Sequence, residues 1–305
     1  MRPLLAVVGP TAVGKSRLAV QLAQRFNGEI IGADSRQVYR YMDIGTAKPD
    51  LAERSLAPHH LIDIIDPDQP FSLAQYQAIA TASITSIREK GRVPLLVGGT
   101  GLYVKAVLEG WQTPAVSPDL RFRYNMEEKA KREGGPQELY RELTAIDPVA
   151  AEKIDPRNVR RVIRALEVVN TTGRLFSEAG TREKPPFDVY TLGLTAERGV
   201  LYNIADRRVD AMLTNGLVEE VERLVAMGYG YDLPAMSGIG YRQIGQYLQG
   251  ELTLEQAVEK MKTATHRFIR HQYAWFRLTD ESIHWYDINQ APENAIIEEI
   301  DRLLQ

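Results

Sequence analysis

A glycine-rich octapeptide near the N-terminus, GPTAVGKS (9–16), has the residue types and spacing of a phosphate-binding loop. It matches G-x-x-x-x-G-K-[ST], follows the apolar run LLAVV and precedes an amphipathic stretch. Gly9 and Gly14 would let the backbone curl, so that successive N–H groups face an anion beneath the positive end of a helix. Lys15 would add a mobile positive charge, and the Ser16 hydroxyl is placed to bind Mg²⁺. The octapeptide therefore predicts a site for a chain of phosphates.

The rest of the chain has to indicate which phosphate compound is bound. A typical nucleoside triphosphatase ends a later apolar strand with an acidic Mg²⁺ ligand, whereas here VPLLV (93–97) runs into GGTGLY (98–103) without a carboxylate. No NKxD-like guanine-reading motif is present either. The sequence thus gives little support for a GTPase.

Asp34 is the next residue that could do chemistry beside this loop, because it directly follows the apolar run GEIIGA (28–33). The carboxyl end of a strand next to a phosphate cradle is where an α/β sheet presents its functional groups. An aspartate there can accept a proton from a nucleophile that approaches the bound phosphate compound. The spacing alone leaves open whether Asp34 does this or only caps a turn.

A predicted helix at 155–172 combines an apolar stripe with an arginine face. We expect Asp155-Pro156 to start this helix and Gly173 to follow its end. No acid is interleaved among its arginines, so they would repel one another, and this favours an anionic partner. A second stretch, 254–278, has a similar pattern, but there we expect Met261 and Trp275 to be core residues. The arginines of the first helix are Arg157, Arg160, Arg161 and Arg164.

Short apolar runs alternate with helical patterns over the first hundred residues, which is typical of a parallel sheet covered by helices on both faces. We expect strands at 4–8, 28–33, 60–66, 93–99 and 189–194. The sequence pattern changes after Trp111. TPAVSP (113–118) resembles a linker, and charged helical segments follow it. The sequence therefore predicts an α/β core formed by residues 1–111 and 189–305, interrupted by a mostly helical insertion domain at 112–188. We expect helices at 15–26, 72–89, 197–214, 215–227 and 254–277.

The composition is that of an ordinary globular chain. It has 305 residues, a formal net charge of −3, and 25% charged and 44% hydrophobic residues. No apolar run approaches the ~20 residues of a membrane-spanning helix, so we expect no membrane partner. The absence of cysteine excludes thiol catalysis and cysteine-bound zinc or iron–sulfur clusters. The negative net charge argues only weakly against a nucleic-acid partner, because the basic residues are concentrated in two zones of the chain.

Six motifs together resemble one family, the tRNA dimethylallyltransferases, also called tRNA isopentenyltransferases. In chain order these are GPTAVGKS, ADSRQVYRYMDIGTAKP, PHHLIDIIDP, LLVGGTGLY, RALEVVNTTG and GIGYRQ. The resemblance covers nearly the whole chain and implies an α/β fold with a P-loop NTPase or kinase-like parallel-sheet core. It implies transfer of a dimethylallyl group from dimethylallyl diphosphate to N6 of the adenosine 3′-adjacent to the anticodon. The tRNAs would be those that read codons beginning with U, and the P-loop would hold the diphosphate leaving group.

The resemblance also implies roles for individual residues. Asp34 would be the general base, and Arg208 in the helix YNIADRRVDAML would contact the diphosphate, with Arg207 as its competitor for that role. The cofactor would be Mg²⁺ on Ser16, and the enzyme would be a cytoplasmic monomer. The catalytic group would be Asp34, Thr11, Lys15 and Arg208, and the diphosphate would be bound by Gly9, Pro10, Thr11, Ala12, Val13, Gly14, Lys15 and Ser16.

A larger set of residues would contact the anticodon stem-loop and hold the flipped adenosine. Two positions that are usually arginine in the family are His266 and His271, which would bind phosphate more weakly at neutral pH, so we leave them out. The remaining histidines lack metal-ligand spacing. The predicted tRNA-binding residues are Asp34, Ser35, Arg36, Gln37, Thr100, Arg121, Arg123, Arg160, Arg161, Arg164, Gly240, Arg242 and Gln243.

Three other functions fit part of the pattern. A small-molecule P-loop kinase shares the phosphate loop but needs neither the arginine-faced helix nor GGTGLY. A prenyltransferase that acts on free adenylate would not need the long insertion. A non-catalytic tRNA-binding module would not need Asp34 beside a complete phosphate loop.

Overall fold

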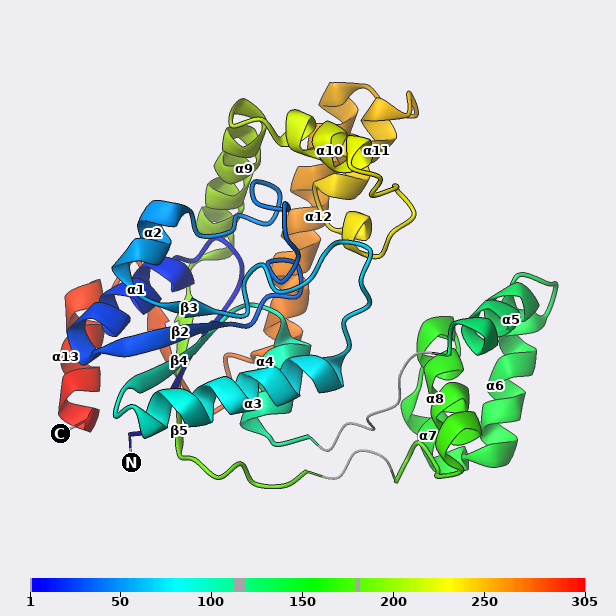
Figure 1. The fold of residues 1–305 in the computed structure, drawn as a ribbon, viewed down its shortest axis with the longest axis horizontal. Helices are drawn as coiled ribbons and strands as arrows, with labels where there is room; N and C mark the ends of the chain where they lie inside the picture. The colour runs from blue at the N-terminus through cyan, green and yellow to red at the C-terminus, as the bar shows by residue number, and fades with distance from the viewer. Residues whose placement is uncertain (1, 112–118, 179–181, 305) are drawn as a thin grey trace. The chain divides into compact units, whose positions relative to one another are not determined.

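The computed structural model of the chain describes residues 2–111, 119–178 and 182–304 (Figure 1). The chain forms two compact units. The first contains residues 1–71, 76–108 and 185–305, and the second contains 72–75 and 109–184. The insertion was expected at 112–188, and the longer range of the second unit is 109–184; residues 72–75 of that unit were not part of the expected insertion. The predicted linker at 113–118 lies outside the described residues.

A parallel sheet of six strands forms the centre of the first unit, in the order β3-β2-β4-β1-β5-β6. Strands β1, β2 and β4 are buried along their whole length, and apart from Glu29 of β2 they contain no charged residue. These three strands and β5 confirm the predicted α/β core. The strands are β1 Leu4–Val8, β2 Gly28–Gly32, β3 His59–His60, β4 Val93–Val97, β5 Val189–Thr195 and β6 Ile283–Asp287.

Helices cover both faces of this sheet (Figure 1). Leu5 and Val7 of β1 point to the face where α1 and α13 pack, and they share one core with both helices. On the opposite face α3 is docked by Tyr76, whose Oη donates a hydrogen bond to the Gly32 carbonyl at 3.0 Å. The Tyr76 ring stacks on Tyr103 of α4. These helices are α1 Lys15–Phe26, α2 Leu51–Leu56, α3 Leu73–Glu89, α4 Gly101–Leu108 and α13 Glu293–Leu304.

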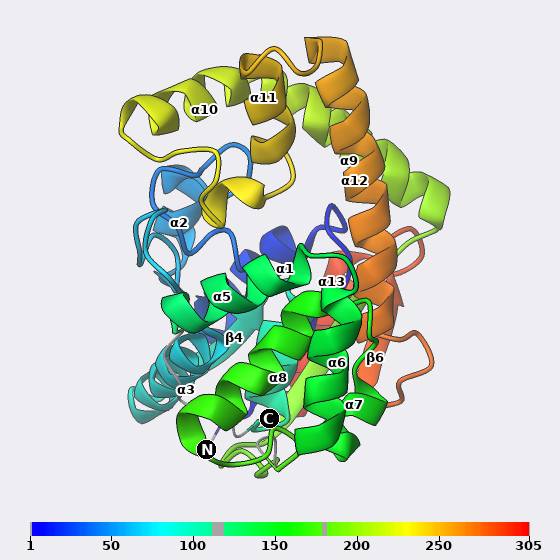
Figure 2. The ribbon, with the colours of Figure 1, turned by 90° about the vertical axis from the view of Figure 1, so that its right-hand side faces the viewer.

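A second core of the first unit lies among the helices that gather beyond the ends of the strands (Figures 1 and 2). Val38 and Met42 from the segment after β2 are buried in this core, so the helices pack directly on the chain that follows Asp34. These elements are α9 Arg198–Thr214, α10 Leu217–Ala226, the 3₁₀ turn η1 Ala235–Ser237, α11 Tyr241–Leu248 and α12 Leu254–Trp275.

The second unit is a helical bundle with its own apolar core. The expected helix start at Asp155 was wrong: α8 begins at Val159, because the Asn158 side chain caps it by accepting from the Arg161 amide at 3.2 Å. Its predicted end was correct, since Gly173 adopts the left-handed conformation, with φ of 68°. The helices are α5 Leu120–Ala130, α6 Gly135–Ile146, α7 Pro148–Lys153 and α8 Val159–Thr172.

Two further parts differ from expectation. The strand predicted at 60–66 is limited to His59–His60, because Leu61 and Asp63 have positive φ angles and break the extended run. Beyond residue 277 no strand or helix was expected, whereas the structure has β6 and α13 there. No helix in the described part of the chain is both long and apolar enough to cross a membrane.

Candidate active site

A pocket of about 790 Å³ opens at the carboxyl ends of β1, β2 and β4. Its lining comes from the loop after β1, the turn after β2, the loop after β4, and helices α9 and α12. This is the edge at which a parallel α/β sheet presents its functional groups. The pocket brings together all four residues that the sequence predicts for catalysis, Thr11, Lys15, Asp34 and Arg208. It also contains four of the predicted tRNA-binding residues, Ser35, Arg36, Gln37 and Thr100.

The loop between β1 and α1 has the backbone of a phosphate cradle. Gly9 has a φ of 135°, and a Cβ atom there would overlap the carbonyl oxygen of Leu194 in β5. Gly14 has a φ of 94° and caps the N-terminus of α1, whose first turn carries no acidic residue. Within the loop, Gly9, Pro10 and Val13 are buried. Ser16, at the start of α1, is exposed and lines the pocket. The N-terminal end of α1 therefore offers its N–H groups to an anion.

Two cations meet over this loop. Lys15 Nζ donates to the Pro10 carbonyl at 2.6 Å, and Arg208 Nη1 donates to Thr11 Oγ1 at 3.3 Å. Burial and the nearby Arg208 charge lower the pKa of Lys15 to about 7, although Asp34 opposes this shift. Burial likewise lowers the pKa of Arg208 from its ordinary value. Such crowding of positive groups leaves a place for an anion that would neutralise both.

The structure separates the two arginines that the sequence left as competitors. Arg208 lines the pocket, and Arg207 is exposed and donates to the Asn203 carbonyl of its own helix. Consecutive helix positions point about 100° apart, so only one of them can face the loop. Of the two, Arg208 is the one placed to contact a bound diphosphate.

Asp34 lines the pocket directly after β2. Its Oδ1 accepts a hydrogen bond from the Arg36 amide at 2.8 Å, so the side chain does cap the turn that it starts. The alternatives of turn cap and reactive carboxylate are therefore compatible, because one oxygen holds the turn and the group still faces the pocket. Its charge acts on both Lys15 and Arg208, which places the carboxylate beside the phosphate cradle.

Neighbours of Asp34 are held by polar contacts from other parts of the first unit. Thr100 Oγ1 accepts from the Ser35 amide at 3.0 Å, which joins the loops after β2 and β4. The Arg36 guanidinium donates to the Pro234 carbonyl at 2.7 Å, and so this side chain is engaged with the segment before α11. Gln37 donates through Nε2 to the carbonyls of Thr46 and Ala47. The turn 34–37 is thus fixed by loops on three sides.

Gln272 of α12, which no sequence motif indicated, is 2% exposed and lines the pocket. Its Oε1 accepts from the Thr11 amide at 2.8 Å and its Nε2 donates to the Gly99 carbonyl at 3.0 Å. This amide therefore joins the phosphate loop to the loop after β4. No spacing rule could have indicated this contact, because Thr11 and Gln272 are 261 positions apart.

Helix α12 contributes more to the pocket than expected. The prediction that Trp275 is a core residue was wrong: its side chain lines the pocket, is 38% exposed and packs close to Gly101. Met261 is buried as predicted, and it also reaches the pocket. His271 lines the pocket as well. His266 Nε2 instead lies 2.8 Å from Asp206 Oδ1, which accepts its hydrogen bond, and its ring stacks on a tyrosine of α9.

The predicted residues of the GIGYRQ motif lie at the start of α11 and outside the pocket lining. Gly240 has a φ of 96° and its amide donates to Gln243 Oε1 at 2.9 Å. The Gln243 side chain is 2% exposed, so it caps the helix and has no free group at the surface. Arg242 is exposed.

The arginine face of the insertion differs from the expected array of unpaired charges. That expectation was wrong for Arg157, which pairs with Asp155 at 2.7 Å, and for Arg164, which pairs with Glu167 at 2.6 Å. Glu167 is fully buried and also binds Arg123 through two hydrogen bonds of 2.8 Å. Arg123 and Arg164 therefore hold this bundle together. Three exposed arginines, Arg121, Arg160 and Arg161, have no ion pair within the described residues of the unit.

The donor set at the phosphate loop suits Mg²⁺ that binds together with a phosphate ligand. Mg²⁺ is usually held by one or two protein oxygens, by water and by substrate phosphates rather than by a complete protein cage. The Ser16 hydroxyl lines the pocket at the start of α1 and is exposed there. An oxygen-only set of this kind fits a hard divalent cation.

Comparisons with known proteins place most of this chain in one family. The IPP transferase family model matches residues 37–279. A tRNA dimethylallyltransferase of Roseiflexus sp. is 54% identical over 277 residues, which cover 91% of this chain and 90% of the relative. One of Dehalococcoides mccartyi is 50% identical over 297 residues, covering 97% of this chain and 91% of the relative.

Solved structures show the same relationship. The tRNA isopentenylpyrophosphate transferase of Bacillus halodurans superposes with a TM-score of 0.73 at 43% identity, covering 99% of this chain and 95% of that one. A eukaryotic dimethylallyltransferase acting on tRNA superposes with a TM-score of 0.81 at 28% identity, covering 99% of this chain and 80% of that one. The chain belongs to the IPP transferase family, the family of the tRNA dimethylallyltransferases.

Proposed function

We propose that this protein transfers a dimethylallyl group from dimethylallyl diphosphate to N6 of the adenosine 3′-adjacent to the anticodon. The tRNAs are those that read codons beginning with U, and diphosphate is released. One observation carries the proposal: a complete phosphate cradle and a carboxylate share a single pocket. A diphosphate ester and a proton-bearing nucleophile would meet there without any phosphoryl transfer.

On the donor side, the protein has to stabilise a leaving diphosphate. The bond between the allylic carbon and the diphosphate oxygen breaks, and its electron pair leaves with the oxygen. Lys15, Arg208, Thr11 and the N–H groups at the start of α1 line this side of the pocket. Fixed positive groups of this kind lower the barrier because they are already oriented when the charge develops.

On the acceptor side, adenine N6 is a weak nucleophile because its lone pair is delocalised into the ring. The new bond joins N6 to the allylic carbon, and one N6 proton passes to the Asp34 carboxylate. Asp34 therefore acts as the general base, with its second oxygen held by the Arg36 amide. The adenosine has to leave the anticodon stack to reach it, as in other enzymes that modify bases.

Mg²⁺ on Ser16 would supply positive charge to the diphosphate oxygens. The exposed arginines of the insertion, Arg121, Arg160 and Arg161, would contact tRNA phosphates. We place the enzyme in the cytoplasm, where its tRNA substrates are, and we expect it to act as a monomer.

Mass spectrometry of nucleosides tests the proposal. Unmodified tRNA is incubated with the protein, Mg²⁺ and dimethylallyl diphosphate, then digested, and we expect one dimethylallyl adenosine per tRNA that reads a codon beginning with U. Parallel reactions replace the tRNA by adenosine monophosphate, or replace the prenyl donor by ATP. Prenylation of free adenylate instead of tRNA, or phosphoryl transfer from ATP, would replace the proposed function by one of its rivals.

A further inference from the structure

The loop Asp43–Lys48 forms part of the pocket wall. Gly45, Thr46 and Ala47 line the pocket. The loop lies between the turn that carries Asp34 and helix α2, and residues 41 and 47 in this region have positive φ angles. Backbone in this conformation is kept only when its surroundings hold it.

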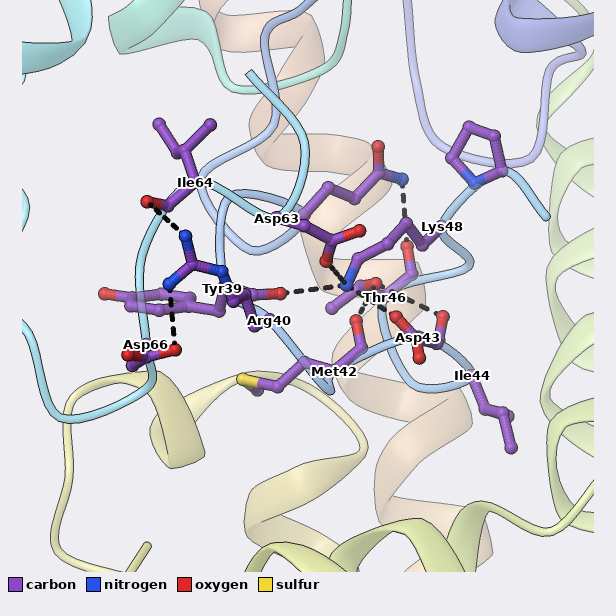
Figure 3. Close-up of polar contacts among 12 residues, drawn as sticks. Tyr39, Arg40, Met42, Asp43, Ile44, Thr46, Lys48, Asp63, Ile64 and Asp66 are labelled. Carbon is purple, nitrogen blue, oxygen red and sulfur yellow. Dashed lines mark hydrogen bonds and ion pairs between the residues drawn. The ribbon is translucent and has the colours of Figure 1, made fainter. Parts of the chain in front are cut away.

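Lys48 holds the loop from one side, as Figure 3 shows. Its side chain is 1% exposed, and Nζ donates to Asp43 Oδ1 and Asp63 Oδ1, each at 2.6 Å, and to the Tyr39 carbonyl at 2.8 Å. The ammonium group therefore has a partner for each of its three protons. It ties both ends of the loop to one point and ties that point to the segment after β3.

Glu220 of α10 holds the loop from the other side. Its side chain is fully buried, and its carboxylate accepts from the backbone amides of Asp43, Ile44 and Gly45 at 3.0, 2.8 and 3.1 Å. Tyr241 Oη donates to the same carboxylate at 2.6 Å. Three successive N–H groups that converge on one anion make a backbone nest, so the loop conformation depends on this carboxylate.

The loop acts on the acceptor side of the pocket through Gln37. Gln37 Nε2 donates to the Thr46 carbonyl at 3.2 Å and to the Ala47 carbonyl at 3.1 Å. Gln37 lines the pocket three positions after Asp34, in the turn whose first residue is the base. The phosphate loop has separate supports in Gln272 and Arg208. Displacement of the 43–48 loop therefore disturbs the acceptor side and leaves the diphosphate side in place.

We infer that Lys48 and Glu220 are positioning residues that lock the Asp43–Lys48 loop and thereby set the place of the acceptor adenosine relative to Asp34. The inference rests on the proposed prenyl transfer to tRNA. In this inference the Asp43–Lys48 loop positions the acceptor adenosine, and the phosphate loop positions the prenyl donor.

The test compares Lys48→Met and Glu220→Gln with a matched control, Arg40→Met. Arg40 joins the same two segments as Lys48, through Asp66 at 3.1 Å and the Ile64 carbonyl at 3.4 Å (Figure 3). None of these three residues lines the pocket. We expect kcat/KM for tRNA to fall roughly a hundredfold in the first two variants, the size of effect that a misplacement of about 1 Å produces. The Kd for dimethylallyl diphosphate, measured by calorimetry, should be unchanged. In Arg40→Met the loss should stay within about fivefold, because exposed ion pairs contribute little.

The absence of cysteine from the chain allows a rescue experiment. Lys48→Cys is alkylated with 2-bromoethylamine in denaturant, which rebuilds a lysine-like side chain at this position alone, and the protein is then refolded beside identically treated wild type. We expect the alkylated protein to regain most of the kcat/KM that Lys48→Met lacks.

Three outcomes would overturn the inference while wild type still transfers the prenyl group. These are a normal kcat/KM in folded Lys48→Met and Glu220→Gln, an equal loss in Arg40→Met, and a parallel loss of diphosphate affinity. If Lys48→Met does not fold, Glu220→Gln and the alkylated protein decide by the same criteria. Failure of wild type itself to modify tRNA would instead overturn the proposed function.

Discussion

Asp34 has two functions that a single substitution can separate at the scale of the residue. One oxygen accepts from the Arg36 amide and keeps the turn, while the group as a whole faces the pocket beside Lys15 and Arg208. Asparagine preserves the first function, because its carbonyl oxygen can still accept from that amide. It removes the second, because an amide does not take up the proton of N6.

We therefore expect Asp34→Asn and Asp34→Ala to bind dimethylallyl diphosphate nearly as wild type and to lose transfer. General-base catalysis contributes about 10²–10⁴-fold, so kcat should fall by that factor in both variants. Single-turnover prenylation and calorimetric binding measure the two effects. A variant that retains more than about a tenth of wild-type turnover would remove Asp34 from the role of base.

Lys15 makes diphosphate binding depend on pH. Its pKa is lowered from 10.5 to about 7, so the free protein loses this positive charge as the pH rises through 7. Bound diphosphate favours the protonated amine and raises its pKa, so binding takes up a proton above pH 7 and the affinity decreases there. The second ionisation of a phosphate ester lies near 6, so the ligand contributes little to this range.

We expect the Kd for dimethylallyl diphosphate to rise by up to about tenfold per pH unit between about 7 and 9, and calorimetry in buffers of different ionisation heat should show proton uptake. Lys15→Arg should bind with a much flatter pH dependence, since a guanidinium stays protonated over this range. A flat profile in wild type would show that Lys15 keeps its proton in the free protein.

At the scale of the element, α12 determines the shape of the donor site. Gln272 is buried and joins the Thr11 amide to the Gly99 carbonyl, so the helix, the phosphate loop and the loop after β4 form one block. Trp275 packs close to Gly101 one turn further along the same helix. A helix far along the chain thus decides where the phosphate loop sits.

Removal of the Gln272 amide should therefore weaken both the fold and diphosphate binding. In Gln272→Leu the Thr11 amide and the buried Gly99 carbonyl lose their partner, and the unpaired buried carbonyl costs about 1–3 kcal/mol. We therefore expect a lower Tm and a higher Kd for dimethylallyl diphosphate. Gln272→Glu keeps the acceptor for the Thr11 amide and should fall between leucine and wild type. Thermal unfolding and calorimetry give both quantities, and an unchanged Kd in Gln272→Leu would show that the phosphate loop does not need this support.

At the scale of the whole molecule, a net charge of −3 conceals two different uses of arginine. Arg123 and Arg164 neutralise the buried Glu167, and Arg157 is paired with Asp155. The exposed and unpaired arginines in the described part of α8 are Arg160 and Arg161. Only the exposed, unpaired arginines can bind an anionic partner without breaking an ion pair that holds the fold.

We expect tRNA affinity to fall steeply between about 50 and 200 mM salt, because binding to phosphates releases counterions. The Arg160→Ala/Arg161→Ala variant should bind more weakly, with a log–log salt slope shallower by about 0.7–0.9 for each phosphate that is no longer neutralised. Arg157→Ala, which removes a charge already bound to Asp155, is the control and should change the slope little. Equal slopes in wild type and the double variant would exclude this face from the RNA surface.

Local sequence determined much of the fold and the core of the site. Continuous apolar runs predicted the buried strands, and GPTAVGKS predicted a phosphate loop at the start of a helix, because strand burial, glycine conformations and helix dipoles are properties of a few adjacent residues. Asp34 was placed at a strand end for the same reason. The start of α8 and the short β3 were missed, since a cap at Asn158 and the turn at Asp63 depend on which side chain finds a partner.

Only the tertiary structure decided which side chains meet. Arg208 rather than Arg207 faces the phosphate loop, and Gln272 supports that loop across 261 positions. Glu220 and Lys48 hold a loop whose motif gives no indication of these contacts. Burial makes each of these contacts obligatory, because a polar group removed from water has to find its partner within the protein. The sequence by itself determined which chemistry the chain carries. The packing of distant helices decided the geometry of the site that performs this chemistry. Contacts between residues far apart in the chain depend on where their helices and strands come together in space.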